Sequence, residues 1–177
     1  AKSADIYAFI IDRLRAYLRD QSVAGKAFTS AEIDAVLSQD PAQINDLIER
    51  LTALREFNAL PEAAQLAAAN KRVGNILKKI EGNVEAKIND ALLQEPAEKA
   101  LAITLAKIKP EADALFERGD YTNSLKALAA LKAPVDDFFD NVMVNADDPA
   151  LKANRQGLLA TLHQAMNRVA DLSKLAA

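Results

Sequence analysis

The chain has 177 residues, a formal net charge of −3 and 50% hydrophobic residues, which suits one domain or two small ones. The absence of cysteine excludes disulfides and thiolate metal sites, and a single histidine, His163, excludes His-rich metal sites and weakens any Ser-His mechanism. Because the chain is slightly acidic, it is no generic polyanion binder, and a nucleic-acid site would have to be a local patch.

The first third of the chain carries strong helical signals. Residues 4–20 show helical spacing of the apolar side chains Ile6, Ile10, Leu14 and Tyr17. A capping box, with Thr29 as the N-cap and Glu32 three residues later, predicts the start of a second helix. Asp40 as a cap and Pro41 at the first helical position predict the start of a third.

The rest of the chain continues the helical pattern. Further helices are expected near 61–80, 84–94, 96–119, 121–132, 134–144 and 149–175. Pro110 should kink or break its helix, since proline lacks a backbone N–H. Strand alternation never exceeds a few residues, and much of the apolar content is alanine. The sequence therefore predicts an all-α, multi-helix bundle of about eight or nine helices, forming a single domain over 1–177 that was excised from a longer chain.

The helix predicted over 61–80 has an unusual charge pattern. Lys71, Arg72, Asn75, Lys78 and Lys79 share an arc of about 120°. The opposite side carries Leu66, Val73, Ile76, Leu77 and Ile80. Within 67–79 there is no acidic residue to pair with the cations. Gly74, at the edge of the arc, would let a backbone or a nucleotide approach closely. We predict a row of phosphate contacts from the cations, with Asn70 or Asn75 available for base edges. The alternative is that the lysines only solvate an exposed face.

Two arginines outside this helix are further candidate RNA contacts. Arg15 shares a helix face with Arg19, and the alternative for both is a solvated face with local ion pairs. Arg155 follows the start of the last helix, and its alternative role is a salt bridge to Asp147 or Asp148. Aromatic side chains that could stack on unpaired bases are Phe9, Tyr7 and Tyr121.

The stretch "DDFFD", Asp136 to Asp140, matches the aspartate-rich motif of isoprenoid synthases, whose carboxylates hold Mg²⁺. A metal enzyme of that kind needs a second metal motif on a facing helix, and the sequence contains none. The favoured interpretation is a buried stripe of Phe138, Phe139, Val142 and Met143, with the aspartates directed outward. We expect no cofactor and no metal in this chain.

Four segments together resemble one family. They are "FIIDRLRAYL", "LPEAAQLAAANKRVGNILKK", "VDDFFDNVMVNADDPALKANR" and "VADLSKL", which run in order from near residue 6 to residue 175. The chain is similar to the C-terminal region of bacterial glycyl-tRNA synthetase β subunits. That region in turn resembles the helical anticodon-binding domain named for an Asp-Ala-Leu-Arg signature, although the literal signature is absent here.

The resemblance implies a function in translation. The α subunit of such a holoenzyme activates glycine with ATP, whereas the β subunit binds the tRNA. The chain would then be a non-catalytic, cytoplasmic module that grips the anticodon arm of glycine tRNA. Its partners would be this tRNA, the remainder of the β subunit and the α subunit, with no membrane and no DNA. The alternative from another class is a protein-interaction module that docks an acidic partner through the helix over 61–80.

Overall fold

The computed structural model describes residues 2–23, 25–39 and 44–176, and this part of the chain is mostly helical, with one small hairpin. The helices are α1 (Lys2–Asp20), α2 (Ser30–Leu37), α3 (Ile44–Asn58), α4 (Ala63–Lys78), α5 (Pro96–Glu117), α6 (Tyr121–Ala127), α7 (Lys132–Asn141) and α8 (Pro149–Met166). Three short 3₁₀ turns are η1 (Asp90–Leu92), η2 (Leu128–Leu131) and η3 (Leu172–Leu175). The strands β1 (Ser22–Val23) and β2 (Lys26–Ala27) pair antiparallel. The all-α class is therefore confirmed.

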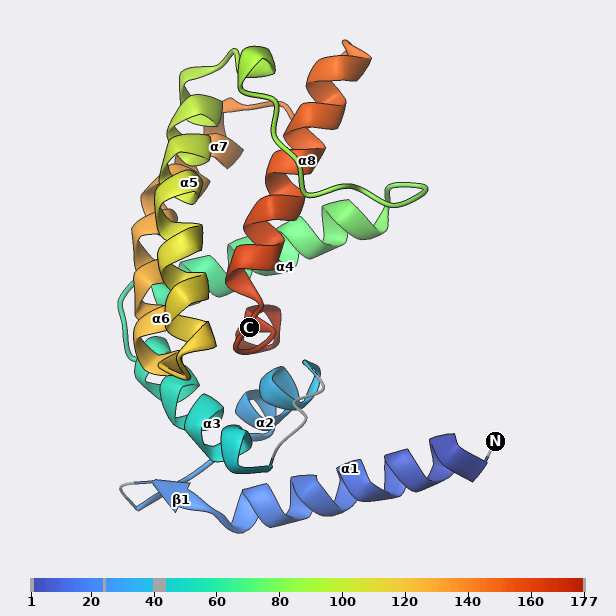
Figure 1. Ribbon diagram of the computed structural model, residues 1–177, viewed down its shortest axis with the longest axis vertical. Helices are drawn as coiled ribbons and strands as arrows, with labels where there is room; N and C mark the ends of the chain where they lie inside the picture. Colours follow the sequence, from blue (N-terminus) through green and yellow to red (C-terminus); the bar gives the residue numbers. More distant parts are fainter. Residues whose placement is uncertain (1, 24, 40–43, 177) are drawn as a thin grey trace.

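The helices form a body from which α1 projects (Figure 1). Helices α5, α6 and α7 lie together along one side, and α8 crosses α4 beside them (Figure 1). One hydrophobic core joins these elements, with Phe57, Leu101, Phe138 and Leu158 all fully buried. None of the helices in the described ranges combines the length and the apolar character that crossing a bilayer requires.

The capping box at α2 is confirmed. The Thr29 backbone N–H donates to Oε1 of Glu32, and the Glu32 N–H donates to Oγ1 of Thr29, both at 3.1 Å. Arg55 of α3 donates to the same Glu32 carboxylate and to the carbonyl oxygens of Lys26 and Ala27. The cap thus also ties the hairpin to α3. The predicted start of a helix at Asp40 and Pro41 lies outside the described residues.

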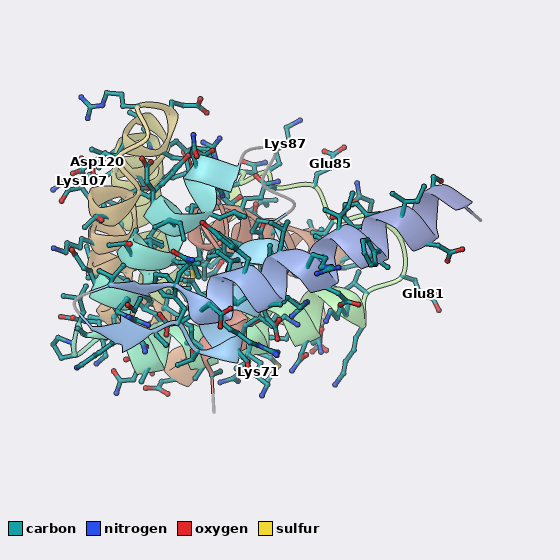
Figure 2. The ribbon with its side chains drawn as sticks, turned by 90° about the horizontal axis from the view of Figure 1, so that it is seen from below. Lys71, Glu81, Glu85, Lys87, Lys107 and Asp120 are labelled. Carbon is teal, nitrogen blue, oxygen red and sulfur yellow. The ribbon has the colours of Figure 1, made fainter. Side chains whose placement is uncertain are left out.

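The prediction of a helix over residues 84–94 is wrong. Residues 83–89 form an irregular segment, and only the turn η1 follows, while Glu85 and Lys87 point outward (Figure 2). The side chain of Asn154 in α8 replaces the missing helical hydrogen bonds at one end of the segment. Its Oδ1 accepts from the N–H of Asn89 at 2.7 Å, and its Nδ2 donates to the Asn89 carbonyl at 3.0 Å. An intramolecular partner of this kind outweighs a weak local preference for helix.

Two further predictions, a break at Pro110 and the end of the last helix, also differ from the structure. Helix α5 continues through Pro110 to Glu117, so the expected break is wrong. An interior proline costs about 3 kcal/mol, and the burial of Leu101, Leu105 and Ile108 on the inner face of α5 offsets this cost. The last helix ends at Met166 rather than near residue 175, because the chain turns there and forms η3.

Candidate nucleic-acid interface

Helix α4 has one inner and one outer face, as its sequence pattern predicts. Ala63, Leu66, Ala67 and Val73 are buried against the rest of the molecule. Lys71, Arg72, Asn75, Lys78 and Lys79 are exposed. We call the four cations of this set, Lys71, Arg72, Lys78 and Lys79, the basic stripe. Lys71 lies at the outer edge of the molecule, far from Lys107 and Asp120 (Figure 2).

The charge of the basic stripe is not neutralised by neighbouring carboxylates. Across residues 2–23, 25–39 and 44–176, its four cations take part in no ion pair. Other cations of the described chain are paired, among them Lys109 with Asp113 at 2.7 Å and Lys126 with Glu56 at 3.2 Å. The basic stripe therefore keeps its positive potential for an external anion.

Arg72 is held in position by an aromatic ring. Its guanidinium carbon lies 4.2 Å from the centroid of the Phe139 ring in α7. Phe139 is half-buried and meets Phe138 edge-on, with 5.6 Å between the ring centroids. A guanidinium over an aromatic face is stabilised by a cation–π interaction. The contact limits the rotamers of Arg72 while leaving its side chain exposed. The pair could not be predicted from the sequence, because the two residues lie far apart in the chain.

Gly74 serves a different purpose from the expected one. A Cβ placed on Gly74 would have the Nε2 atom of His163 in α8 as its nearest neighbour, at 3.8 Å. The glycine thus faces the crossing of α4 with α8, and it does not open the exposed arc to a ligand. Burial lowers the pKa of His163, an effect that Asp171 opposes and the nearby charge of Lys78 reinforces.

The prediction that Asn70 reads base edges does not fit the structure. Asn70 is fully buried, and its amide pairs with the Asn167 amide through two hydrogen bonds of 2.8 Å. Asn167 also donates to the carbonyl of His163 and accepts from the N–H of Leu172. Asn70 therefore fastens α4 to the turn between α8 and η3. Asn75 remains exposed within the arc of the basic stripe.

Arg155 is likewise an interior residue. Its Nη2 donates to Oε1 of Glu98 in α5 at 2.6 Å, and its Nη1 donates to the Met143 carbonyl at 2.7 Å. Both side chains of this ion pair are buried. Its partner is thus neither Asp147 nor Asp148, and Asp148 instead caps α8 by accepting from the N–H of Ala150. Because Arg155 is buried and already paired, it drops out of the candidate RNA contacts.

Arg15 belongs to a surface separate from the basic stripe. It forms an ion pair with Asp34 of α2, so the ion-pair alternative describes it better than an RNA contact. Among the stacking candidates, Phe9 is exposed beside Arg13, with 5.3 Å from the guanidinium carbon to the ring centroid. Tyr121 is buried and lies next to Arg50, so it cannot stack on a base.

A polar cleft of about 530 Å³ lies beside α5 and the end of α8, and no sequence pattern predicts it. Its charged groups neutralise one another, since Asp113 meets Lys109 at 2.7 Å and Arg168 at 3.2 Å. Burial alone would raise the pKa of Asp113, but hydrogen bonds from Lys109 and Arg168 lower it. The cleft therefore offers much less free charge than the basic stripe.

The aspartates of the "DDFFD" stretch make local contacts. Asp136 pairs with Lys132 one turn earlier at 3.2 Å, and the Asn141 amide donates to Asp137 at 2.7 Å. Phe138 and Val142 are buried and Phe139 is half-buried, as the expected apolar stripe requires, but Met143 is 71% exposed, so its predicted burial is wrong. Over the described part of the chain, no three histidine or carboxylate side chains are grouped as a metal site would require.

Residues 66–175 match the DALR anticodon binding domain. The chain belongs to this family. The matched region of the DALR anticodon-binding domain begins within α4 and ends in η3, so it contains the basic stripe, the Asn70–Asn167 pair and the Arg155–Glu98 pair. Helices α1, α2 and α3 lie outside the matched region.

Curated relatives of this DALR anticodon-binding domain are glycine–tRNA ligase beta subunits. The chain is 65% identical over 169 residues to that of Janthinobacterium sp. (strain Marseille) and 63% identical over 172 residues to that of Leptothrix cholodnii. The beta subunit of Dechloromonas aromatica is 59% identical over all 177 residues of the chain. These alignments cover 96%, 97% and 100% of the chain but only 23%, 23% and 24% of the relatives. The chain thus spans about a quarter of the length of the relatives it matches.

Proposed function

We propose that this DALR anticodon-binding domain binds the anticodon arm of glycine tRNA through the basic stripe. It does so as part of a β subunit that, together with an α subunit, supports the ATP-dependent glycylation of the tRNA. The domain supplies binding energy and orientation, and the chemistry takes place elsewhere in the holoenzyme. The observation that supports this proposal best is the exposed row of unpaired cations within the region that matches the family.

The roles of the residues follow from their chemistry. Lys71, Lys78 and Lys79 are flexible point charges that suit phosphate oxygens without demanding a fixed geometry. Arg72 offers a planar guanidinium with an orientation set by Phe139, which suits either a bidentate phosphate contact or stacking on an unpaired base. Asn75 lies among them and can donate to and accept from a base edge.

Charge reversal tests the proposal. The variant K71E/R72E/K78E/K79E should bind glycine tRNA much more weakly, and the slope of log K against log salt should become shallower. Each lost phosphate contact contributes about 0.7–0.9 to that slope, so four lost contacts would reduce it by about 3. Affinity is measured by titration over a range of salt concentrations, and circular dichroism verifies that the helices persist.

A matched control removes the effect of net charge. The variant K99E/K107E/K152E/K174E changes the charge by the same amount at four exposed lysines outside α4. It should bind glycine tRNA nearly as well as the parent chain, apart from a general loss that high salt removes. If both variants lose the same affinity, the basic stripe is only a solvated face.

A second titration separates anticodon recognition from general docking. Glycine tRNA should bind more tightly than a copy with an exchanged anticodon. Equal affinity would rule out anticodon reading by this domain. If an acidic protein displaced the tRNA while unrelated RNA failed to do so, a protein-docking role for α4 would replace the proposal.

A further inference from the structure

The first half of α1 presents large apolar side chains to solvent. Ile6 is 60% exposed, Phe9 61% and Ile10 49%, and Tyr17 further along is 51% exposed. Single exposed apolar residues are common on protein surfaces, but several along one helix indicate a binding surface. We call Ile6, Phe9 and Ile10 the apolar ridge.

The apolar ridge lies beside the side of α1 that packs against the body. Ile6, Ile10, Leu14 and Tyr17 follow one another at intervals of four, four and three residues, which places them on one side of the helix. In the second half of α1 a neighbouring side meets the body, because Leu18 is fully buried, Leu14 is half-buried and Arg15 pairs with Asp34 of α2, whereas Tyr17 stays 51% exposed. The first half of α1 extends past the body (Figure 1). Helix α1 thus packs through one side only, and the side with Ile6, Ile10 and Tyr17 stays exposed.

We infer that the apolar ridge packs against an apolar surface of the β subunit outside this chain. The alignments cover 97% and 100% of the chain, but the relatives are about four times as long as the chain. Most of a β subunit of that length therefore lies outside this chain. The inference rests on the proposed assignment to a β subunit but not on RNA binding.

An RNA occupant fits α1 poorly. The helix contains four cations and three aspartates, and one of the cations, Arg15, is already paired with Asp34. The net charge of α1 is therefore close to zero, whereas RNA binding depends on unpaired positive charge. The basic stripe of α4 meets this requirement, and the apolar ridge does not.

A second copy of the chain is also a poor fit. The apolar ridge covers about two turns of helix, roughly 10 Å in length and 10 Å in width. Such a surface is several times smaller than the roughly 800 Å² per partner that a stable complex buries. A contact within one chain needs far less area, because the tether holds the two surfaces at a high effective concentration.

Cysteine labelling tests the inference, because the chain has no cysteine of its own. The variants are Ile6→Cys and Ile10→Cys, and the matched control is Ile103→Cys at an isolated position of α5 that is 69% exposed. Maleimide labelling rates are measured in this chain and in a full-length β subunit with its other reactive cysteines replaced. At positions 6 and 10 the rate should fall at least tenfold in the full-length subunit, while the control rate stays the same.

Equal rates in the chain and in the full-length subunit would overturn the inference. Protection that rises with the concentration of the chain would indicate a second copy, and protection that requires added tRNA would indicate RNA; either result would also overturn it. Hydrogen exchange on the unmodified subunit gives a second measurement, since the amides of residues 5–11 should exchange more slowly there than in the chain. A failure of tRNA binding would leave these results unchanged, so the two proposals fail separately.

Discussion

Replacing Gly157 by alanine should destabilise the fold, although alanine normally favours helix. Gly157 lies inside α8, beneath the irregular segment 83–89. A Cβ at this position would lie 2.1 Å from the Lys87 carbonyl oxygen and 3.3 Å from that of Glu85. The first distance is more than 1 Å short of ordinary contact, which begins near 3.4 Å. Since the neighbour is backbone rather than a flexible side chain, the whole segment has to move.

The magnitude follows from three effects. Overpacking of this kind costs about 1–3 kcal/mol. Displacing the segment also strains the two hydrogen bonds between Asn154 and Asn89, each of which contributes about 1 kcal/mol. Against this, alanine in a helix interior gains about 1 kcal/mol over glycine. We therefore expect Gly157→Ala to lower the free energy of unfolding by about 2–4 kcal/mol.

Gly74→Ala is the matched control, because Gly74 also lies inside a helix. Its added Cβ would meet only the Nε2 atom of His163 at 3.8 Å, which is ordinary contact. This variant should be unchanged or more stable, by up to about 1 kcal/mol. Urea unfolding of both variants gives the free energies by linear extrapolation. Hydrogen exchange of the Asn89 amide shows whether segment 83–89 has moved.

The opposite signs of the two substitutions make the test decisive. If Gly157→Ala proved as stable as Gly74→Ala, segment 83–89 would not cross α8 in contact with Gly157. A loss of stability with unchanged exchange at the Asn89 amide would also contradict the reasoning, because the cost would then arise elsewhere in α8.

Three further predictions concern buried polar groups. Glu98→Ala leaves the Arg155 guanidinium buried without its carboxylate and should lower the free energy of unfolding in urea by about 3–5 kcal/mol. The double variant with Arg155→Met should recover part of this loss. Asn70→Ala removes the partner of the Asn167 amide and should cost about 1–3 kcal/mol in the same assay. The lowered pKa of His163 means that the fold favours its neutral form, so the free energy of unfolding should fall as the pH drops below about 6.5. In parallel unfolding curves from pH 7 to 5, the His163→Gln variant should lose less stability than the parent chain.

The amphipathic character of α4 was predictable because it is a local property. The spacing of Leu66 and Val73 against Lys71 and Lys78 fixes which side of the helix can be buried, whatever the rest of the fold. The capping box of Thr29 and Glu32 is local in the same sense. Both features are confirmed. The exposure of the cations thus follows from their spacing alone, without any tertiary contact.

The irregular segment was not predictable, because its causes lie in another helix. Residues 83–89 carry no strong local signal, and their conformation depends on the side chain of Asn154 and on the space above Gly157. The same reason explains the two misplaced RNA contacts. An asparagine or arginine in the sequence shows which hydrogen bonds it can make, but the partner of Asn70 lies 97 residues away and that of Arg155 lies 57 residues away.

Asn70 still affects the proposed interface although it is buried, because the interior contacts of α4 determine how rigidly this helix is held. The Asn70–Asn167 amide pair fixes its inner face, and Phe139 restrains Arg72 on its outer face. A rigid helix presents its cations at fixed spacings, so less conformational entropy is lost when they meet a regularly spaced phosphate chain. It follows that Asn70→Ala, which touches no exposed side chain, should weaken tRNA binding along with stability, whereas Asn75→Ala should affect binding alone.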